Sequence, residues 1–201
     1  MINVSASALT RMSARQLKYT RDNGIKRKVT DLMVEGTKNA LEASRSVYIE
    51  MGGSFKTQKG SPEIKIFFCV DEVKLFSNSA VIIEHKMCKF APKESYKQTS
   101  LIQAAFMKTL VYYSDRLLKT ADFIEGDKYE LDLSDKSLFG ELNFGGQRFG
   151  VDCDYKPIMG FFVKKARASL DYASAVAFDN EYFGNTWSIL SKHIKYHIIN
   201  I

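Results

Sequence analysis

The sequence predicts an α/β fold in which a mixed central β-sheet is flanked by helices. Two helical patterns precede a hairpin rich in β-forming residues, and a long helix, short strands and further helices follow it. The hairpin strands are hydrophobic almost without interruption, which is typical of a sheet covered on both faces. The 201 residues suit one domain, expected to span residues 1–201.

The first helix is predicted from about Ser5 to Tyr19. Ser5 or Ser7 can act as its N-cap, because a serine hydroxyl accepts a hydrogen bond from the free backbone N–H groups of the first turn. The segment Asp22-Asn23-Gly24 breaks the helical pattern and ends the helix.

A second helix is predicted from about Val29 to Met51. Gly52-Gly53 stops it, and Ser54–Pro62 is predicted to be a polar loop. Apolar and small side chains recur near helical spacing along this segment, at Leu32, Met33, Gly36, Ala40, Ala43, Val47 and Tyr48.

A β-hairpin is predicted next, from Ile64–Leu75 and Ala80–Lys86 joined by a turn at Ser77-Asn78-Ser79. Strand alternation places Glu84 and Lys86 on one face, with His85 on the other. Folding the hairpin back on Asn78 brings Asp71 level with Glu84. Two carboxylates and an ammonium group therefore converge at one place.

The rest of the chain is predicted to complete the sheet and cover it. A long helix runs from about Tyr96 to Leu118, and Gly145-Gly146 forms a hairpin turn between two later strands. The expected strands are Lys128–Leu133, Leu138–Phe144 and Arg148–Tyr155, and the expected helices are Phe161–Ala175 and Trp187–His197.

Composition narrows the class of protein. The net charge of +6 and the pI near 9.1 suit a polyanionic partner such as a nucleic acid. The three cysteines include no CxxC pair, which argues against a zinc or iron–sulfur site. No apolar run is long enough to span a bilayer, and Met1–Thr10 lacks the pattern of a signal peptide. We expect a soluble, cytoplasmic protein.

Asp71, Glu84 and Lys86 are the residue types that phosphodiester hydrolysis requires. Two carboxylates hold Mg²⁺, which lowers the pKa of a bound water and neutralises the developing charge. A neighbouring lysine orients the water and stabilises the charged transition state. The backbone carbonyl of His85 can complete the coordination, since hard cations accept peptide oxygens.

The arrangement resembles the PD-(D/E)xK nuclease superfamily, which carries an Asp on one strand and Glu-x-Lys on the next. Three further segments resemble its RecB-type and phage-type exonuclease branch, over about residues 4–113. They are Ser5-Ala6-Ser7-Ala8-Leu9 followed by Tyr19, then Glu35-Gly36-Thr37 followed by Leu41-Glu42, and then Gln103 on the predicted long helix. In that branch the glutamine helps to hold the active site and the DNA.

The sequence departs from this branch at several positions. Ala40 stands where relatives carry a metal-binding histidine, so Glu35 is the best substitute ligand and Glu42 a weaker one. Val70 replaces the proline before the aspartate, and Met107 replaces a tyrosine. The iron–sulfur cysteines of several relatives are also missing.

The resemblance implies a restriction-endonuclease-like core over about residues 29–155 and a magnesium-dependent deoxyribonuclease, with Mn²⁺ as an alternative ion. It implies an exonuclease of DNA recombination, repair or replication, of the size found in phages. DNA is the expected partner, with no membrane and no small-molecule cofactor, and the oligomeric state is left open. The expected catalytic residues are Asp71, Glu84, Lys86 and Gln103, and the expected metal ligands are Glu35, Asp71, Glu84 and the His85 carbonyl. The alternative is a catalytically inactive nucleic-acid-binding module on the same fold.

Two weaker patterns leave alternatives open. His193 and His197 have the i, i+4 spacing of a helical zinc site, but a third ligand is lacking nearby, so we favour a core or solvated pair. A basic segment near the C-terminus can line a DNA groove or form a solvated helix face. It comprises Arg148, Lys156, Lys164, Lys165 and Arg167, with Tyr155, Phe161 and Phe162 nearby.

Overall fold

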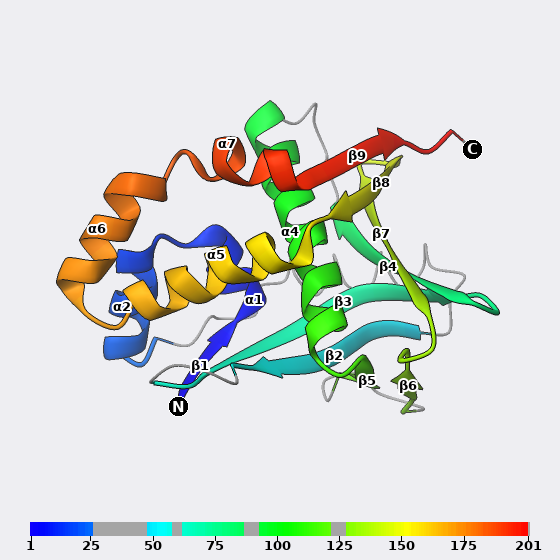
Figure 1. Ribbon diagram of the computed structural model, residues 1–201, viewed down its shortest axis with the longest axis horizontal. Coiled ribbons are helices and arrows are strands. Elements are labelled where there is room, and N and C mark those ends of the chain that lie inside the picture. Colours follow the sequence, from blue (N-terminus) through cyan, green and yellow to red (C-terminus); the bar gives the residue numbers. More distant parts are fainter. Residues whose placement is uncertain (26–47, 58–61, 87–92, 122–127, 201) are drawn as a thin grey trace.

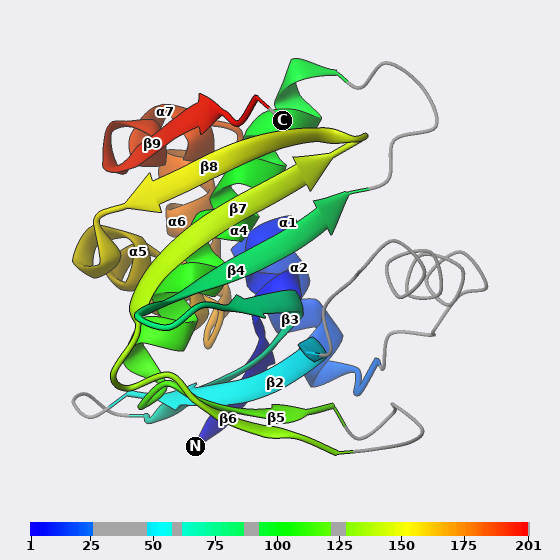
Figure 2. The same ribbon diagram turned by 90° about the vertical axis from the view of Figure 1, so that its right-hand side faces the viewer.

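A computed structural model describes residues 1–25, 48–57, 62–86, 93–121 and 128–200. The strands form one mixed sheet in the order β6-β5-β2-β3-β4-β7-β8-β9, with β1 paired to β3. Figure 1 shows the sheet, and Figure 2 shows the described helices behind strands β4, β7 and β8. The predicted α/β fold with a mixed sheet and flanking helices is therefore confirmed.

The strands are β1 (Ile2–Ser5), β2 (Tyr48–Lys56), β3 (Ile64–Leu75), β4 (Ser79–Lys86), β5 (Leu117–Thr120), β6 (Glu130–Asp132), β7 (Ser137–Phe144), β8 (Gln147–Cys153) and β9 (Ile194–Ile198). The helices are α1 (Ala6–Arg11), α2 (Ala14–Asp22), α4 (Glu94–Tyr113), α5 (Tyr155–Ala168), α6 (Tyr172–Tyr182) and α7 (Thr186–Leu190), with a 3₁₀ turn at Ser191–His193. Among the described helices, none is both long and apolar enough to cross a bilayer.

Strand β3 is the centre of the site because its two edges are used differently. One edge pairs with β2 from Lys65 to Val73. The other edge pairs with β1 at its start, over Ile64–Phe67, and with β4 at its end, over Glu72–Leu75. Residues 68–71 lie between these two partners, so the second edge opens there.

The first predicted helix is present but is divided in two. Ser5 is the N-cap of α1 and accepts a hydrogen bond from the Ala8 N–H. Of the two predicted N-caps, Ser5 and Ser7, the structure therefore confirms Ser5. Ser13 then caps α2 and forms a capping box with Gln16. Because Ser13 begins a second helix, the chain does not form one continuous helix from Ser5 to Tyr19 as predicted.

The second predicted helix is wrong where the structure describes it. Most of it lies in residues 26–47, outside the described residues, but Tyr48–Met51 begins strand β2. Gly52-Gly53 lies within β2 and does not stop a helix, and the expected loop at residues 54–56 belongs to the same strand. Gly53 has a packing role there, because a Cβ atom on it would meet the Phe68 ring at 2.6 Å.

The hairpin of β3 and β4 is confirmed, and the long helix α4 is confirmed but ends earlier than predicted. It stops at Tyr113 because Asp115 and Arg116 adopt positive φ angles, and residues 117–120 form strand β5. From Ser100 to Val111 every residue of α4 is buried. The helix therefore lies in the core, directly behind the strands that carry the predicted site.

The C-terminal region agrees in part with its prediction. The β7–β8 hairpin turns at Gly145-Gly146, whose φ angles of 59° and 89° favour glycine. The first predicted helix there is two helices, α5 and α6, separated at Ser169–Asp171. The last predicted helix is confirmed over its first part, as α7 and the 3₁₀ turn, but its end is wrong, because Ile194–Ile198 forms β9 against β8. His193 and His197 therefore do not share a helix face.

Candidate active site

The predicted site forms where β4 separates from β3. Glu72 pairs with Ile83, and the next step of this register places Asp71 opposite Glu84. On its other edge β4 pairs with β7 along its whole length, from Ser79 to Lys86. The Asp71 carboxylate accepts a hydrogen bond from the His85 backbone N–H at 2.7 Å. A side chain thus links the two strands where their backbones have moved apart.

Glu84 is the centre of the arrangement. Its side chain is buried, and its Oε1 atom accepts hydrogen bonds from both Lys86 Nζ and Gln103 Nε2. Glu84 and Lys86 lie on the side of the sheet that faces α4, which supplies Gln103. The structure therefore brings together the four residues that were predicted as catalytic: Asp71, Glu84, Lys86 and Gln103.

Burial and mutual repulsion control the protonation of the two acids. Burial, together with the nearby Asp71 charge, raises the pKa of Glu84 to about 7, against the opposing effect of Lys86. Burial also raises the pKa of Asp71, although Lys86 and the His85 N–H favour its charged form. Burial by itself would lower the pKa of Lys86, but the carboxylates of Glu84 and Asp71 outweigh it and raise that pKa.

Glu50 is a third acid at this place, on strand β2. Ile49 pairs with Glu72 and Met51 with Val70, so Glu50 lies opposite Asp71 in the register. It accepts a hydrogen bond from the Cys69 thiol at 3.2 Å, and its φ angle of 48° is unusual for a residue other than glycine. No pattern in the sequence indicated Glu50, because the segment resembled the end of a helix.

Arg11 is a second residue that the sequence did not indicate. It lies in the last turn of α1 and is exposed to solvent. Its positive charge is among those that oppose the burial-driven rise of the Glu84 pKa, and it also disfavours the charged form of Lys86. The Arg11 charge at the end of α1 therefore acts on the Glu84 carboxylate.

Part of the predicted metal site lies outside the described residues. Glu35, the predicted third ligand, and the weaker alternative Glu42 both fall within residues 26–47. The His85 carbonyl as a ligand stays a prediction. The remaining donors suit Mg²⁺, because the part-buried Asp71 and the buried Glu84 are neighbouring carboxylates whose shared negative charge a cation would relieve. Within the described residues, however, no three His, Cys, Asp or Glu side chains meet as a metal-binding group.

The opposite face of the sheet carries a second polar network. The His85 ring bonds Glu72 at 2.9 Å and Asn143 at 3.3 Å. On neighbouring strands Arg148 forms two bonds to Glu141, at 2.5 and 2.6 Å. This network explains why His85 points away from Glu84: its side chain is held by partners on the other face, and only its backbone contacts Asp71.

The predicted basic segment near the C-terminus does not form one surface. Lys165 is buried and donates to the Leu9 carbonyl at 2.8 Å, and burial lowers its pKa to about 8. Lys164 bonds the Tyr182 hydroxyl, and Phe161 and Phe162 are in the core. Neither of the two alternatives describes the whole segment, although two of its members line a groove that is considered below.

Comparison with known proteins identifies no family for this chain. No family model matches the sequence, and no curated protein matches it. Among solved structures, the crystal structure of SSO0001 is similar with a TM-score of 0.45 and 15% sequence identity, over 92% of this chain and 84% of that chain. Inference about function therefore rests on the geometry of the site.

Proposed function

We propose that the chain is a metal-dependent DNA nuclease that hydrolyses phosphodiester bonds. One observation carries the proposal: Lys86 and Gln103 both donate to the buried Glu84 carboxylate, and Asp71 lies beside it. In a hydrolytic site of the PD-(D/E)xK type we expect this arrangement, in which acids and a lysine from a hairpin meet a glutamine from the following helix. The finer proposal is a cytoplasmic exonuclease of DNA recombination, repair or replication.

Each residue has a role in this proposal. Asp71 and Glu84 would hold Mg²⁺ or Mn²⁺, together with Glu35 and the His85 carbonyl. Such an ion supplies a water of lowered pKa and neutralises charge on the phosphate. Lys86 stabilises negative charge on the reacting phosphate, and Gln103 orients the Glu84 carboxylate through its hydrogen bond. The exposed Arg11 attracts the phosphate backbone toward the acids.

A cleavage assay on end-labelled single- and double-stranded DNA tests the proposal. The wild type should cleave in Mg²⁺ or Mn²⁺ and not in EDTA. Glu84→Gln and Lys86→Ala should each lower the rate by about a hundredfold or more, as loss of a group that stabilises transition-state charge does. Arg11→Ala should chiefly raise KM, because it removes attraction for the substrate and leaves the acids in place.

The chain offers a matched control in the Lys119–Glu130 pair between β5 and β6. This pair joins oppositely charged side chains at 2.8 Å, both more than half exposed. Lys119→Ala and Glu130→Gln repeat the charge changes away from the candidate site and should leave cleavage unchanged. Cleavage that persists in EDTA, or that survives Glu84→Gln and Lys86→Ala in folded protein, would contradict the proposal.

A second candidate function is a nucleic-acid-binding module without catalysis. It is favoured by Ala40 and Met107, which stand where the resembling nucleases carry a metal-binding histidine and a tyrosine. DNA binding without cleavage in any divalent metal ion would support this candidate against the first.

A further inference from the structure

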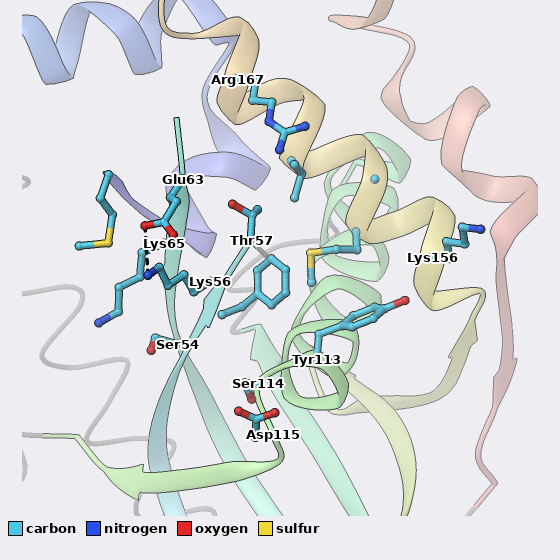
Figure 3. Close-up of a pocket in the computed structure, with 15 residues that line it drawn as sticks. Ser54, Lys56, Thr57, Glu63, Lys65, Tyr113, Ser114, Asp115, Lys156 and Arg167 are labelled. Carbon is cyan, nitrogen blue, oxygen red and sulfur yellow. Dashed lines mark ion pairs between the residues drawn. The ribbon is translucent and has the colours of Figure 1, made fainter. Parts of the chain in front are cut away.

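A wide groove lies at the end of the molecule where α5, the C-terminal end of α4 and the strands β2 and β3 meet. Its volume is about 1400 Å³, and Figure 3 shows side chains from all four elements around it. A site for a small molecule encloses roughly 300–1,000 Å³. The larger size and the open shape suit a segment of polymer better than a compact ligand.

The floor of the groove is apolar and carries an exposed aromatic ring. Phe55 of β2 packs edge-on against Tyr113 at the end of α4, with ring centroids 6.0 Å apart. Met159 and Val163 of α5 complete the apolar surface. Tyr113 is 36% exposed, so part of its side chain stays accessible to a ligand beside Phe55.

Further aromatic rings continue from Tyr113 along the surface. Tyr112 contacts Tyr113 edge-on at 5.1 Å and stacks on Tyr155 at 4.2 Å, and Arg116 lies over the Tyr112 ring. Tyr112 is itself 38% exposed. Successive rings of this kind form a platform on which unpaired bases stack, with cationic groups beside them.

Positive charge predominates around the groove. Four basic residues line it, Lys56, Lys65, Lys156 and Arg167, against two acids, Glu63 and Asp115. Lys56 is paired with Glu63 at 3.0 Å. Lys65 on β3 and Lys156 on α5 have no carboxylate partner among the residues that the structure describes, so their charges are available to an anionic ligand.

We propose that this groove binds a single, unpaired strand of nucleic acid. Positive charge is complementary to the phosphate backbone, and the exposed tyrosine supplies stacking that paired bases in a duplex cannot use. An acidic peptide would satisfy the lysines but would gain less from the flat ring of Tyr113. The choice of a nucleic acid rests on the proposed function, which it deepens by adding a strand-binding surface distinct from the Asp71–Glu84 site.

Fluorescence anisotropy of an end-labelled oligothymidylate, measured with the full chain in EDTA, tests the aromatic part. Tyr113→Ala should weaken binding by about fivefold or more, because each stacked base contributes at least that factor. Tyr113→Phe keeps the ring and should bind like the wild type. Tyr172→Ala, which removes a 66%-exposed tyrosine on α6 outside the groove, is the matched control and should have no effect.

The salt dependence of binding tests the lysines without disturbing the apolar floor. Lys65→Gln combined with Lys156→Gln should reduce the slope of log K against log salt by about 0.7 for each lysine that contacts a phosphate. Lys192→Gln combined with Lys195→Gln removes the same charge from exposed positions near the C-terminus and should leave the slope close to that of the wild type.

Three outcomes would overturn the proposal. The groove variants could bind like their controls, or Tyr113→Ala could weaken duplex binding as much as single-strand binding. Polyglutamate could bind the wild type as tightly as the oligonucleotide does, and equally well after Tyr113→Ala, which would indicate an acidic protein as the ligand. Because EDTA prevents metal-dependent cleavage, failure here is distinct from failure of the catalytic proposal, which is read from the Glu84 and Lys86 variants in Mg²⁺.

Discussion

Glu84 is a buried acid whose pKa of about 7 lies above its ordinary value of 4.5. Between these two pH values the folded chain keeps a proton that the unfolded chain has released. Because the folded state then binds more protons, this group makes the free energy of unfolding fall as the pH rises from about 4.5 to about 7. Stability from this source is therefore greatest below that window and is lost as the pH rises through it.

Glu84→Gln should remove that part of the pH dependence, because an amide keeps the shape of the side chain and does not titrate. Urea unfolding in EDTA, measured from about pH 5 to about pH 8, checks it: the wild type should lose stability relative to Glu84→Gln as the pH rises. Glu63→Gln, at a half-exposed acid paired with Lys56, is the control and should follow the wild type. Parallel curves for the wild type and Glu84→Gln would contradict the assignment.

Among the residues of the candidate site, the sequence predicts those that local geometry brings together. Asp71, Glu84 and Lys86 share one hairpin, so alternation and a turn at Asn78 suffice to place them. Glu50 could not be placed in this way. Its position opposite Asp71 depends on the pairing of β2 with β3 and on a positive φ angle, neither of which its neighbours in the sequence indicate.

At the scale of elements, the sequence pattern does not distinguish a helix from a strand where a glycine has a packing role. The pattern predicts that Gly52-Gly53 ends a helix, but both residues lie inside β2, and Gly53 makes room for the Phe68 ring. The last strand was missed for a related reason. Residues 194–198 are apolar and polar in an order that suits either structure, and pairing with β8 decides in favour of a strand.

Gly53→Ala should therefore destabilise the fold, since the added methyl group must displace the Phe68 ring and the Leu118 side chain. Overpacking of this kind costs about 1–3 kcal/mol, which chemical denaturation measures directly.

Gly160 provides the comparison for that substitution. It lies in α5, and a Cβ atom there would meet nothing within 4 Å. Gly160→Ala should stabilise the chain by about 0.5–1 kcal/mol, because alanine loses less backbone entropy in a helix. Equal effects of the two substitutions would show that the Phe68 contact does not restrict position 53.

At the scale of the whole molecule, the net charge of +6 works against non-specific binding of cations. Stabilisation by a divalent ion would therefore report a specific site. The part-buried Asp71 and the buried Glu84, both with raised pKa values, are the described residues most suited to it. Protons and metal compete for the Glu84 carboxylate, so metal binding should strengthen as the pH rises through about 7 and level off above it.

Mg²⁺ should accordingly raise the unfolding temperature at about pH 8 and have little effect at about pH 5.5, where Glu84 is protonated. A concentration of about ten times Kd adds about 1.4 kcal/mol, or roughly 3–6 °C for a chain of this size. Asp71→Asn should abolish the shift, whereas Asp135→Asn, at an exposed acid in a loop, should retain it. An equal shift in both variants would place the ion elsewhere. No shift in the wild type would favour the non-catalytic module, because a site that binds no metal cannot activate water by the proposed chemistry.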